Sequence, residues 1–163
     1  MHIIEAESSD LPAILELQYL AFQSEAELLG KRDIPPLKQT LNELEAESRQ
    51  GTILKAENDA GEIIGSVRGR VEERTLFIGK LMVHPRWRRQ GLGARLLRAM
   101  EDHCPAGRYE LFTSSLSLGN LNLYQRLGYT RFKESDPGAN PRLIYLEKTP
   151  AAGEGGITLK PGP

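Results

Sequence analysis

The feature that most constrains this 163-residue sequence is a basic turn with two glycines between an apolar run and a leucine-rich segment. Residues 76–83 are nearly all apolar, as in a buried β-strand, and His84-Pro85 ends the run. After Gly91, apolar residues recur at helical spacing at Leu92, Leu96, Leu97 and Met100. The chain therefore passes from a strand through a basic loop into a helix, which indicates a mixed α/β fold.

The turn over residues 84–94 has the chemistry of an anion-binding site. Unpaired N–H groups at a helix N-terminus hold phosphate oxygens, and glycines let the backbone and the ligand come close. Gly91 and Gly93 lie at that point, in a stretch from Arg74 to Met100 that contains seven Lys or Arg residues and no acid. The pattern lacks the Gly-Lys-Ser/Thr of a P-loop and the third glycine of a dinucleotide fingerprint. We therefore predict a pyrophosphate site of another type.

The spacing Arg88-x-x-Gly91-x-Gly93, after a strand that ends in Val-x-Pro, resembles the signature of the GNAT N-acetyltransferase superfamily. The resemblance extends over residues 3–147 and is sharpest over residues 78–128. It implies an α/β fold with a mixed central sheet of about six to seven strands flanked by about four helices. It also implies an enzyme that transfers the acetyl group of acetyl-CoA to a primary amine by direct attack in a ternary complex.

The resemblance also implies which residues bind the cofactor. In the family, the amides of the loop hold the pyrophosphate of CoA, and free backbone groups of the preceding strand pair with the pantetheine arm. The loop positions here are Arg88, Arg89, Gln90, Gly91, Leu92, Gly93 and Ala94, and the strand positions are Leu81, Met82 and Val83. The side chains of the strand positions are expected to pack in the core while their backbone meets the cofactor.

A second motif, Leu-Tyr-Gln-Arg-Leu-Gly-Tyr over residues 123–129, resembles the Leu-Tyr-x-x-x-Gly-Phe/Tyr pattern of the family. The resemblance implies that Tyr124 contacts the cofactor and is the general acid that protonates the departing thiolate. Asn120 lies one helical turn earlier and is expected to bond the pantetheine or the backbone near it. Many family members instead carry Asn seven residues before the tyrosine, a position that Ser117 holds here.

The sequence marks no general base for the amine. An unperturbed alkylamine has a pKa of about 10.4 and must lose a proton before it attacks. His84, Glu25, Glu27, Glu110 and a chain of water molecules all remain candidates. Cys104 is the only cysteine and has no paired His near it in sequence, so we interpret it as structural. No metal site is predicted.

Apolar patterns and turn residues predict the remaining elements. Strands are expected near residues 3–4, 52–57, 62–71, 76–83, 109–114, 129–134 and 142–147, and helices near residues 10–22, 37–50, 91–104 and 120–127. We predict one GNAT domain over residues 1–149. A Gly/Pro-rich tail follows over residues 150–163, and residues 157–159 within it offer a further strand.

Charge and hydropathy favour some settings and partners over others. A formal net charge of -1 gives no overall attraction to nucleic acid or to an anionic membrane. The N-terminus lacks a signal pattern, and no run is long enough to span a bilayer, so a cytoplasmic protein without a membrane partner is expected. Binding of nucleic acid is the weakest hypothesis, because no recognition helix accompanies the arginines of residues 86–98. The sequence leaves a homodimer open.

The acceptor amine is the least defined partner. In the family that the motifs resemble, the first two helices and their connection shape the acceptor site, which falls here on residues 22–36. The acids of that segment either attract a cationic amine or form an ordinary solvated face. Three functions stay open: acetylation of a small-molecule amine, which we favour, acetylation of a protein N-terminus or lysine, and a CoA-binding sensor without turnover.

Overall fold

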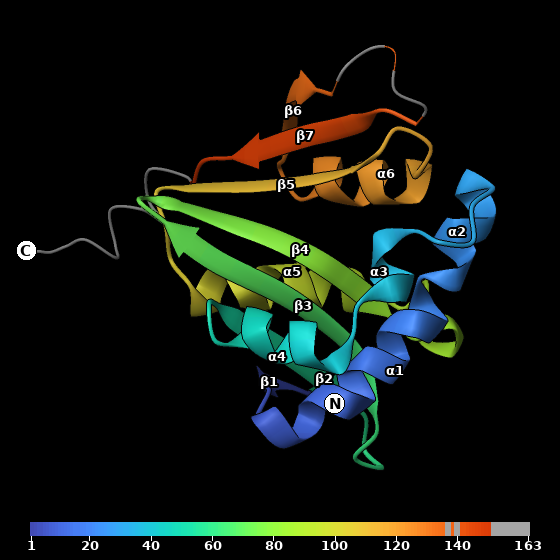
Figure 1. Ribbon diagram of the computed structural model, residues 1–163. Coiled ribbons are helices and arrows are strands. Elements are labelled where there is room, and N and C mark those ends of the chain that lie inside the picture. Colours follow the sequence, from blue (N-terminus) through green and yellow to red (C-terminus); the bar gives the residue numbers. More distant parts are fainter. Residues whose placement is uncertain (136–137, 139–140, 151–163) are drawn as a thin grey trace, which may run out of the picture.

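A seven-stranded mixed sheet forms the centre of the computed structural model, which describes residues 1–135, 138 and 141–150 (Figure 1). Its order is β1-β2-β3-β4-β5-β7-β6, and neighbours are antiparallel except β4 and β5, which are parallel. The strands are β1 (His2–Glu5), β2 (Thr52–Glu57), β3 (Ile63–Glu72), β4 (Thr75–Val83), β5 (Arg108–Ser114), β6 (Thr130–Glu134) and β7 (Leu143–Lys148). The expected mixed α/β fold is confirmed. The predicted tail beyond Pro150, with its further strand, lies outside the described residues.

Helices lie on both faces of the sheet (Figure 1). They are α1 (Leu11–Ala21), α2 (Gln23–Leu29), α3 (Pro35–Lys38), α4 (Leu41–Ser48), α5 (Leu92–His103) and α6 (Leu118–Arg126), with 3₁₀ turns η1 (Ser8–Asp10) and η2 (Pro85–Trp87). The single helix predicted over residues 37–50 is wrong, because Thr40 starts a new helix. Thr40 and Glu43 form a capping box, in which each side chain accepts a hydrogen bond from the backbone N–H of the other residue.

Two apolar layers fix the helices to the sheet. On one face, α5 and α6 pack against the central strands in the main core. Fully buried members of that core include Ala56, Val67, Leu76, Leu96, Leu97, Met100, Tyr129, Ile144 and Leu146. On the other face, Ile14 of α1 packs with Leu44 of α4 and Ile53 of β2. This division leaves the ends of α1, α5 and α6 close to the point where β4 and β5 separate (Figure 1).

A β-bulge changes the face to which the side chains of β4 point. The register between β3 and β4 shifts between Ser66 and Arg68, which leaves one extra residue in β4. Lys80 has the left-handed φ of 49° that marks this irregularity. Ile78 packs on the α5 side, whereas Met82, four residues later, packs against α1. Without the extra residue both side chains would lie on one face.

Candidate active site

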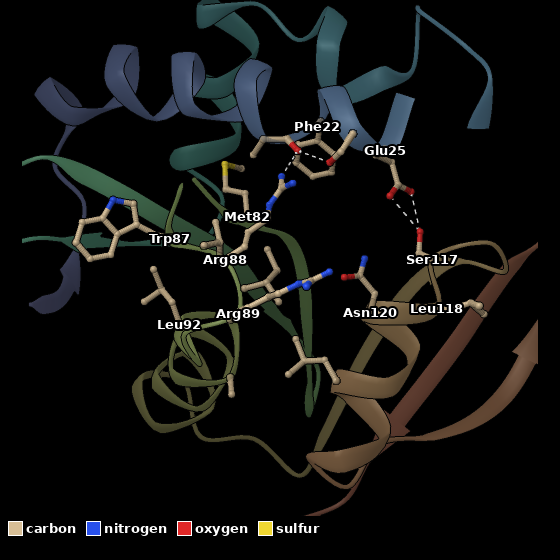
Figure 2. A pocket seen from close by; sticks show the side chains of 18 of the residues that line it. Phe22, Glu25, Met82, Trp87, Arg88, Arg89, Leu92, Ser117, Leu118 and Asn120 are labelled. Carbon is tan, nitrogen blue, oxygen red and sulfur yellow. Dashed lines mark hydrogen bonds between the residues drawn. The ribbon is translucent and has the colours of Figure 1, made fainter. Parts of the chain in front are cut away.

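The site opens where β4 and β5 separate. These strands pair only over Thr75–Phe77 and Arg108–Glu110. Beyond that point lies a cavity of about 720 Å³ between α1 and α2, the end of β4, the loop before α5, and the start of α6. Figure 2 shows the side chains of these elements converging on the cavity from opposite sides.

The loop before α5 is shaped to present backbone N–H groups. Arg89 has a φ of 63° and Gly91 has a φ of 81°, so two left-handed residues flank Gln90. Gly91 is the N-cap of α5, and the first N–H groups of a helix have no partner within the helix. A Cβ atom at Gly91 would meet no atom within 4 Å, whereas one at Gly93 would lie 3.3 Å from Leu123 of α6. The left-handed backbone therefore favours glycine at position 91, and glycine at position 93 gives Leu123 of α6 room to approach closely.

Most of the residues predicted to bind the cofactor line this first cavity. They are Leu81, Met82, Val83, Arg88, Arg89, Gly91, Leu92, Gly93, Ala94 and Asn120. Gln90 does not, and its side-chain amide donates to the carbonyl of Arg86 at 3.5 Å. The guanidinium of Arg88 donates to the carbonyl of Ala21 at the end of α1, at 2.8 Å, so it anchors that helix. Arg89 extends across the cavity toward Asn120 (Figure 2).

Tyr124 lines a second, larger cavity of about 1020 Å³ and does not border the first. Only 6% of the Tyr124 surface is exposed, and its hydroxyl has no hydrogen-bond partner among the described residues. Burial raises the pKa of Tyr124 above its ordinary value, and the negative charge of Glu25 adds to the effect. The hydroxyl therefore keeps its proton and has a hydrogen bond to donate.

The two cavities meet at four residues, Phe22, Glu25, Leu81 and Asn120. At this junction the carboxylate of Glu25 accepts a hydrogen bond from the hydroxyl of Ser117, 3.1 Å from each oxygen (Figure 2). The bond joins α2 to the start of α6 across the opening. The side chain of Asn120 donates to the hydroxyl of Thr113 on β5, at 3.2 Å.

The candidate bases fall into two groups. Glu25 and Glu110 line the second cavity, but Glu110 already accepts a bond from Arg108 at 2.7 Å. His84 and Glu27 line neither of the two cavities. The Nδ1 atom of His84 accepts the backbone N–H of Arg86 and so caps η2. Glu25 is therefore the candidate that the fold brings to the junction.

One face of β4 is open to the second cavity, whereas the apolar run over residues 76–83 predicts a buried strand. Phe77, Gly79 and Lys80 line this cavity, and Gly79 is exposed. Pro35 and Pro36 of α3 and Glu47 of α4 line the same cavity.

A buried polar cluster beneath the second cavity was missed in the sequence. Arg68 of β3 is 4% exposed and donates to Gln18, and also to Gln39 and Glu47 at 3.0 Å each. Burial lowers the pKa of Arg68, and the charge of Glu47 opposes that effect. The only signal in the sequence is an arginine inside the apolar run of β3, which by itself names no partner.

Candidate metal clusters and membrane-spanning helices are both absent from the described residues. Among residues 1–135, 138 and 141–150, no group of three or more His, Cys, Asp or Glu side chains is arranged to hold a metal ion. In the same ranges, no helix is long and apolar enough to cross a membrane.

The sequence model of the acetyltransferase (GNAT) family matches residues 11–129. The chain belongs to the GNAT family. The matched segment runs from the start of α1 to Tyr129, so it includes the loop before α5, the junction of the cavities and Tyr124.

Two curated relatives match parts of this GNAT chain. The UPF0157 protein YqkA of Bacillus subtilis is 28% identical over 119 residues, which cover 72% of this chain and 34% of that protein. The mycothiol acetyltransferase of Kineococcus radiotolerans is 36% identical over 75 residues, or 46% of this chain and 22% of that protein. The chain thus spans about a third or less of the length of these relatives.

A solved structure shows the same architecture over nearly the whole chain. The PaiA N-acetyltransferase of Thermoplasma acidophilum, in complex with coenzyme A, superposes with a TM-score of 0.75 at 17% identity. The superposition covers 91% of this chain and 98% of that chain. At this level of identity the likeness shows the GNAT fold and leaves the acceptor of this chain to be inferred from its own residues.

Proposed function

We propose that this GNAT protein transfers the acetyl group of acetyl-CoA to a primary amine, with a small molecule as the favoured acceptor. The observation that carries the proposal is the pair of cavities that meet at Glu25, Leu81 and Asn120. A donor in the first cavity and an acceptor in the second would come together only at this junction. Such an arrangement suits direct transfer between two bound molecules.

The residues of the first cavity fit coenzyme A. The N–H groups at the start of α5 and the positive charge of Arg89 suit its phosphates. The half-buried Leu81 and Val83 give the pantetheine arm an apolar wall, and beyond Phe77 the edge of β4 that faces β5 has no strand partner among the described residues. When bound, the cofactor supplies an activated acetyl thioester.

Glu25 at the junction and Tyr124 in the second cavity have complementary tasks in this proposal. Glu25 is placed to hold the acceptor ammonium by its charge and to accept a proton from it, directly or through water. Tyr124, which lines the second cavity and keeps its proton, would donate a hydrogen bond to the departing sulfur. Because the pKa of Tyr124 is raised, its hydroxyl stays protonated wherever an alkylamine, with a pKa of about 10.4, begins to deprotonate.

We expect Glu25→Gln to raise the KM for the amine about tenfold or more, because the acceptor loses its counter-charge. The affinity for CoA, measured by calorimetry, should change less than about threefold, since the phosphates are proposed to bind at the start of α5, away from Glu25. Glu27→Gln is the matched control, because Glu27 lies on the same helix, is exposed and lines neither cavity. Equal effects of the two changes on the KM would contradict the role of Glu25.

The test of the proposed function is a calorimetric titration of the purified protein with acetyl-CoA, followed by thiol release with a panel of amines and peptides. Binding with turnover of small amines supports the proposal. Turnover only with peptides would favour a protein N-terminus or lysine as the acceptor. Binding without turnover on any acceptor would favour a CoA-binding sensor, and absence of binding would overturn the proposal. The cytoplasmic location and the homodimer stay predictions.

A further inference from the structure

Lys80 is a half-buried cation on the wall of the second cavity. Its ammonium makes no hydrogen bond or ion pair with the part of the chain that the structure describes. The other charged side chains of this cavity are paired, hydrogen-bonded or exposed to solvent. The paired ones are Glu47, Arg68, Arg70 and Glu110, the hydrogen-bonded one is Glu25, and the exposed ones are Lys31 and Asp33. Among the charged side chains of this cavity, Lys80 is thus the half-buried one without a direct hydrogen-bond or ion-pair partner in the described chain.

Arg68 and Lys80 both interact with the negative charge of one carboxylate, that of Glu47. An oxygen of Glu47 already accepts bonds from Arg68 at 3.0 Å and from Gln39 at 2.8 Å. Arg68 is nearly fully buried, and its Nε–H has no partner within the described residues. Burial lowers the pKa of Lys80, the charge of Glu47 opposes this effect, and the charge of Arg68 adds to it. Together, Arg68, Lys80 and Glu47 carry a surplus positive charge, which is costly to bury unless an anion balances it.

The backbone also marks Lys80 as unusual. Its φ of 49° lies in the left-handed region, which an L-residue with a long side chain adopts at a cost of about 1 kcal/mol or more. Strain of this kind persists where surrounding structure holds it and gathers at functional sites. The bulge at Lys80 is the point at which the side chains of β4 change face, and it directs a lysine to the cavity wall.

We propose that Lys80 binds an acidic group of the acceptor, so that the substrates of this site are amines that also carry a carboxylate or a phosphate. This inference rests on the proposed acetyltransferase function. Glu25 would hold the ammonium at the junction while Lys80 holds the anionic oxygens, and two opposite charges orient one acceptor. The ammonium first loses one proton through Glu25 to water. The neutral amine then forms the amide N–C bond as the thioester C–S bond breaks, and its second proton balances the one that the released thiolate takes up. The product keeps its acidic group but has lost the charge that Glu25 attracts.

The experiment compares acceptors that differ only in charge. Thiol release is measured with acetyl-CoA and ω-amino acids of one to five methylenes, with the corresponding ω-amino amides, and with aminoalkyl phosphates of matched length. For at least one length, kcat/KM for the acid is expected to exceed that for the amide about tenfold or more. Lys80→Gln should lower this acid-to-amide ratio of kcat/KM to the value set by the intrinsic reactivity of the two amines. Lys80→Arg should keep most of the preference for the acid. Because each pair is compared across variants, differences in amine pKa cancel.

Lys38→Met is the control, because Lys38 is exposed and lines neither cavity, and it should leave the ratio unchanged. An acid-to-amide ratio that Lys80→Gln does not alter would overturn the inference while the acetyltransferase function stands. So would an equal loss of rate for acids and amides, because Lys80 would then act as a base or as a structural residue. If acetyl-CoA binds and no acceptor releases thiol, the proposed function fails. Titration of the CoA-loaded protein with N-acetyl ω-amino acids and their amides then tests the anion site alone. Tighter binding of the acid, lost in Lys80→Gln, would support the anion site. Equal binding of acid and amide would overturn it.

Discussion

Replacing Gly91 with glutamate is expected to lower the affinity for coenzyme A by at least about a hundredfold, because the change puts a carboxylate where phosphates are proposed to bind. Gly91 is the N-cap of α5, and a side chain there would project into open space beside the helix N-terminus. The new charge would compete with the cofactor for the same N–H groups. Calorimetric titration with CoA measures the affinity, and thermal unfolding shows whether the fold persists.

Gly61→Glu is the matched control for this change. Gly61 has a φ of 82°, against 81° for Gly91, and a Cβ atom at either position would meet no atom within 4 Å. Both substitutions therefore carry the same backbone penalty of about 1 kcal/mol. Gly61 lies in the turn between β2 and β3 and borders neither cavity, so its variant should bind CoA normally. Near-normal affinity of the Gly91 variant, or an equal loss in both, would remove the loop before α5 from the proposed site.

The strands could be predicted from the sequence because each carries its own local signal. β2 has the predicted bounds, and the other six strands differ from theirs by one or two residues. Apolar runs separated by turn residues such as those at 58–61 fix both the type and the limits of such elements. The loop before α5 can also be predicted from the sequence, because its signals are adjacent in the chain. They are a strand, a basic turn with two glycines and a leucine-rich helix.

The acceptor side could not be predicted, because its features depend on contacts between distant residues. The sequence predicts a connection where α2 forms, since only Ala26 of its seven residues is buried and no apolar period marks the helix. Glu25 and Ser117 are 92 positions apart, so their bond across the junction has no local signal. The bulge at Lys80 follows from the pairing of β4 with β3, and a lysine is an unexpected residue for a left-handed position.

Tyr124→Phe is expected to lower kcat about a hundredfold, within the range that a positioned proton donor contributes, while the affinity for CoA changes little. The folded protein should lose little stability, because the hydroxyl of Tyr124 has no hydrogen-bond partner among the described residues. The variant removes the proposed donor from the second cavity and leaves the ring in the core, packed near Tyr129 with centroids 6.2 Å apart. Steady-state thiol release and calorimetric titration with CoA measure the two effects separately.

Tyr129→Phe should show the opposite pattern and so serves as the control. The hydroxyl of Tyr129 donates to Glu101 at 2.6 Å, and neither of the two cavities is lined by this residue. Its loss should cost about 2 kcal/mol of unfolding free energy, measured with urea, because the acceptor is a carboxylate, and should leave kcat unchanged. An unchanged kcat in the Tyr124 variant would mean that water or another group protonates the sulfur. A fall in kcat that is equal in both variants would instead assign the effect to packing of the two rings, because Tyr124 lines the second cavity and Tyr129 lines neither.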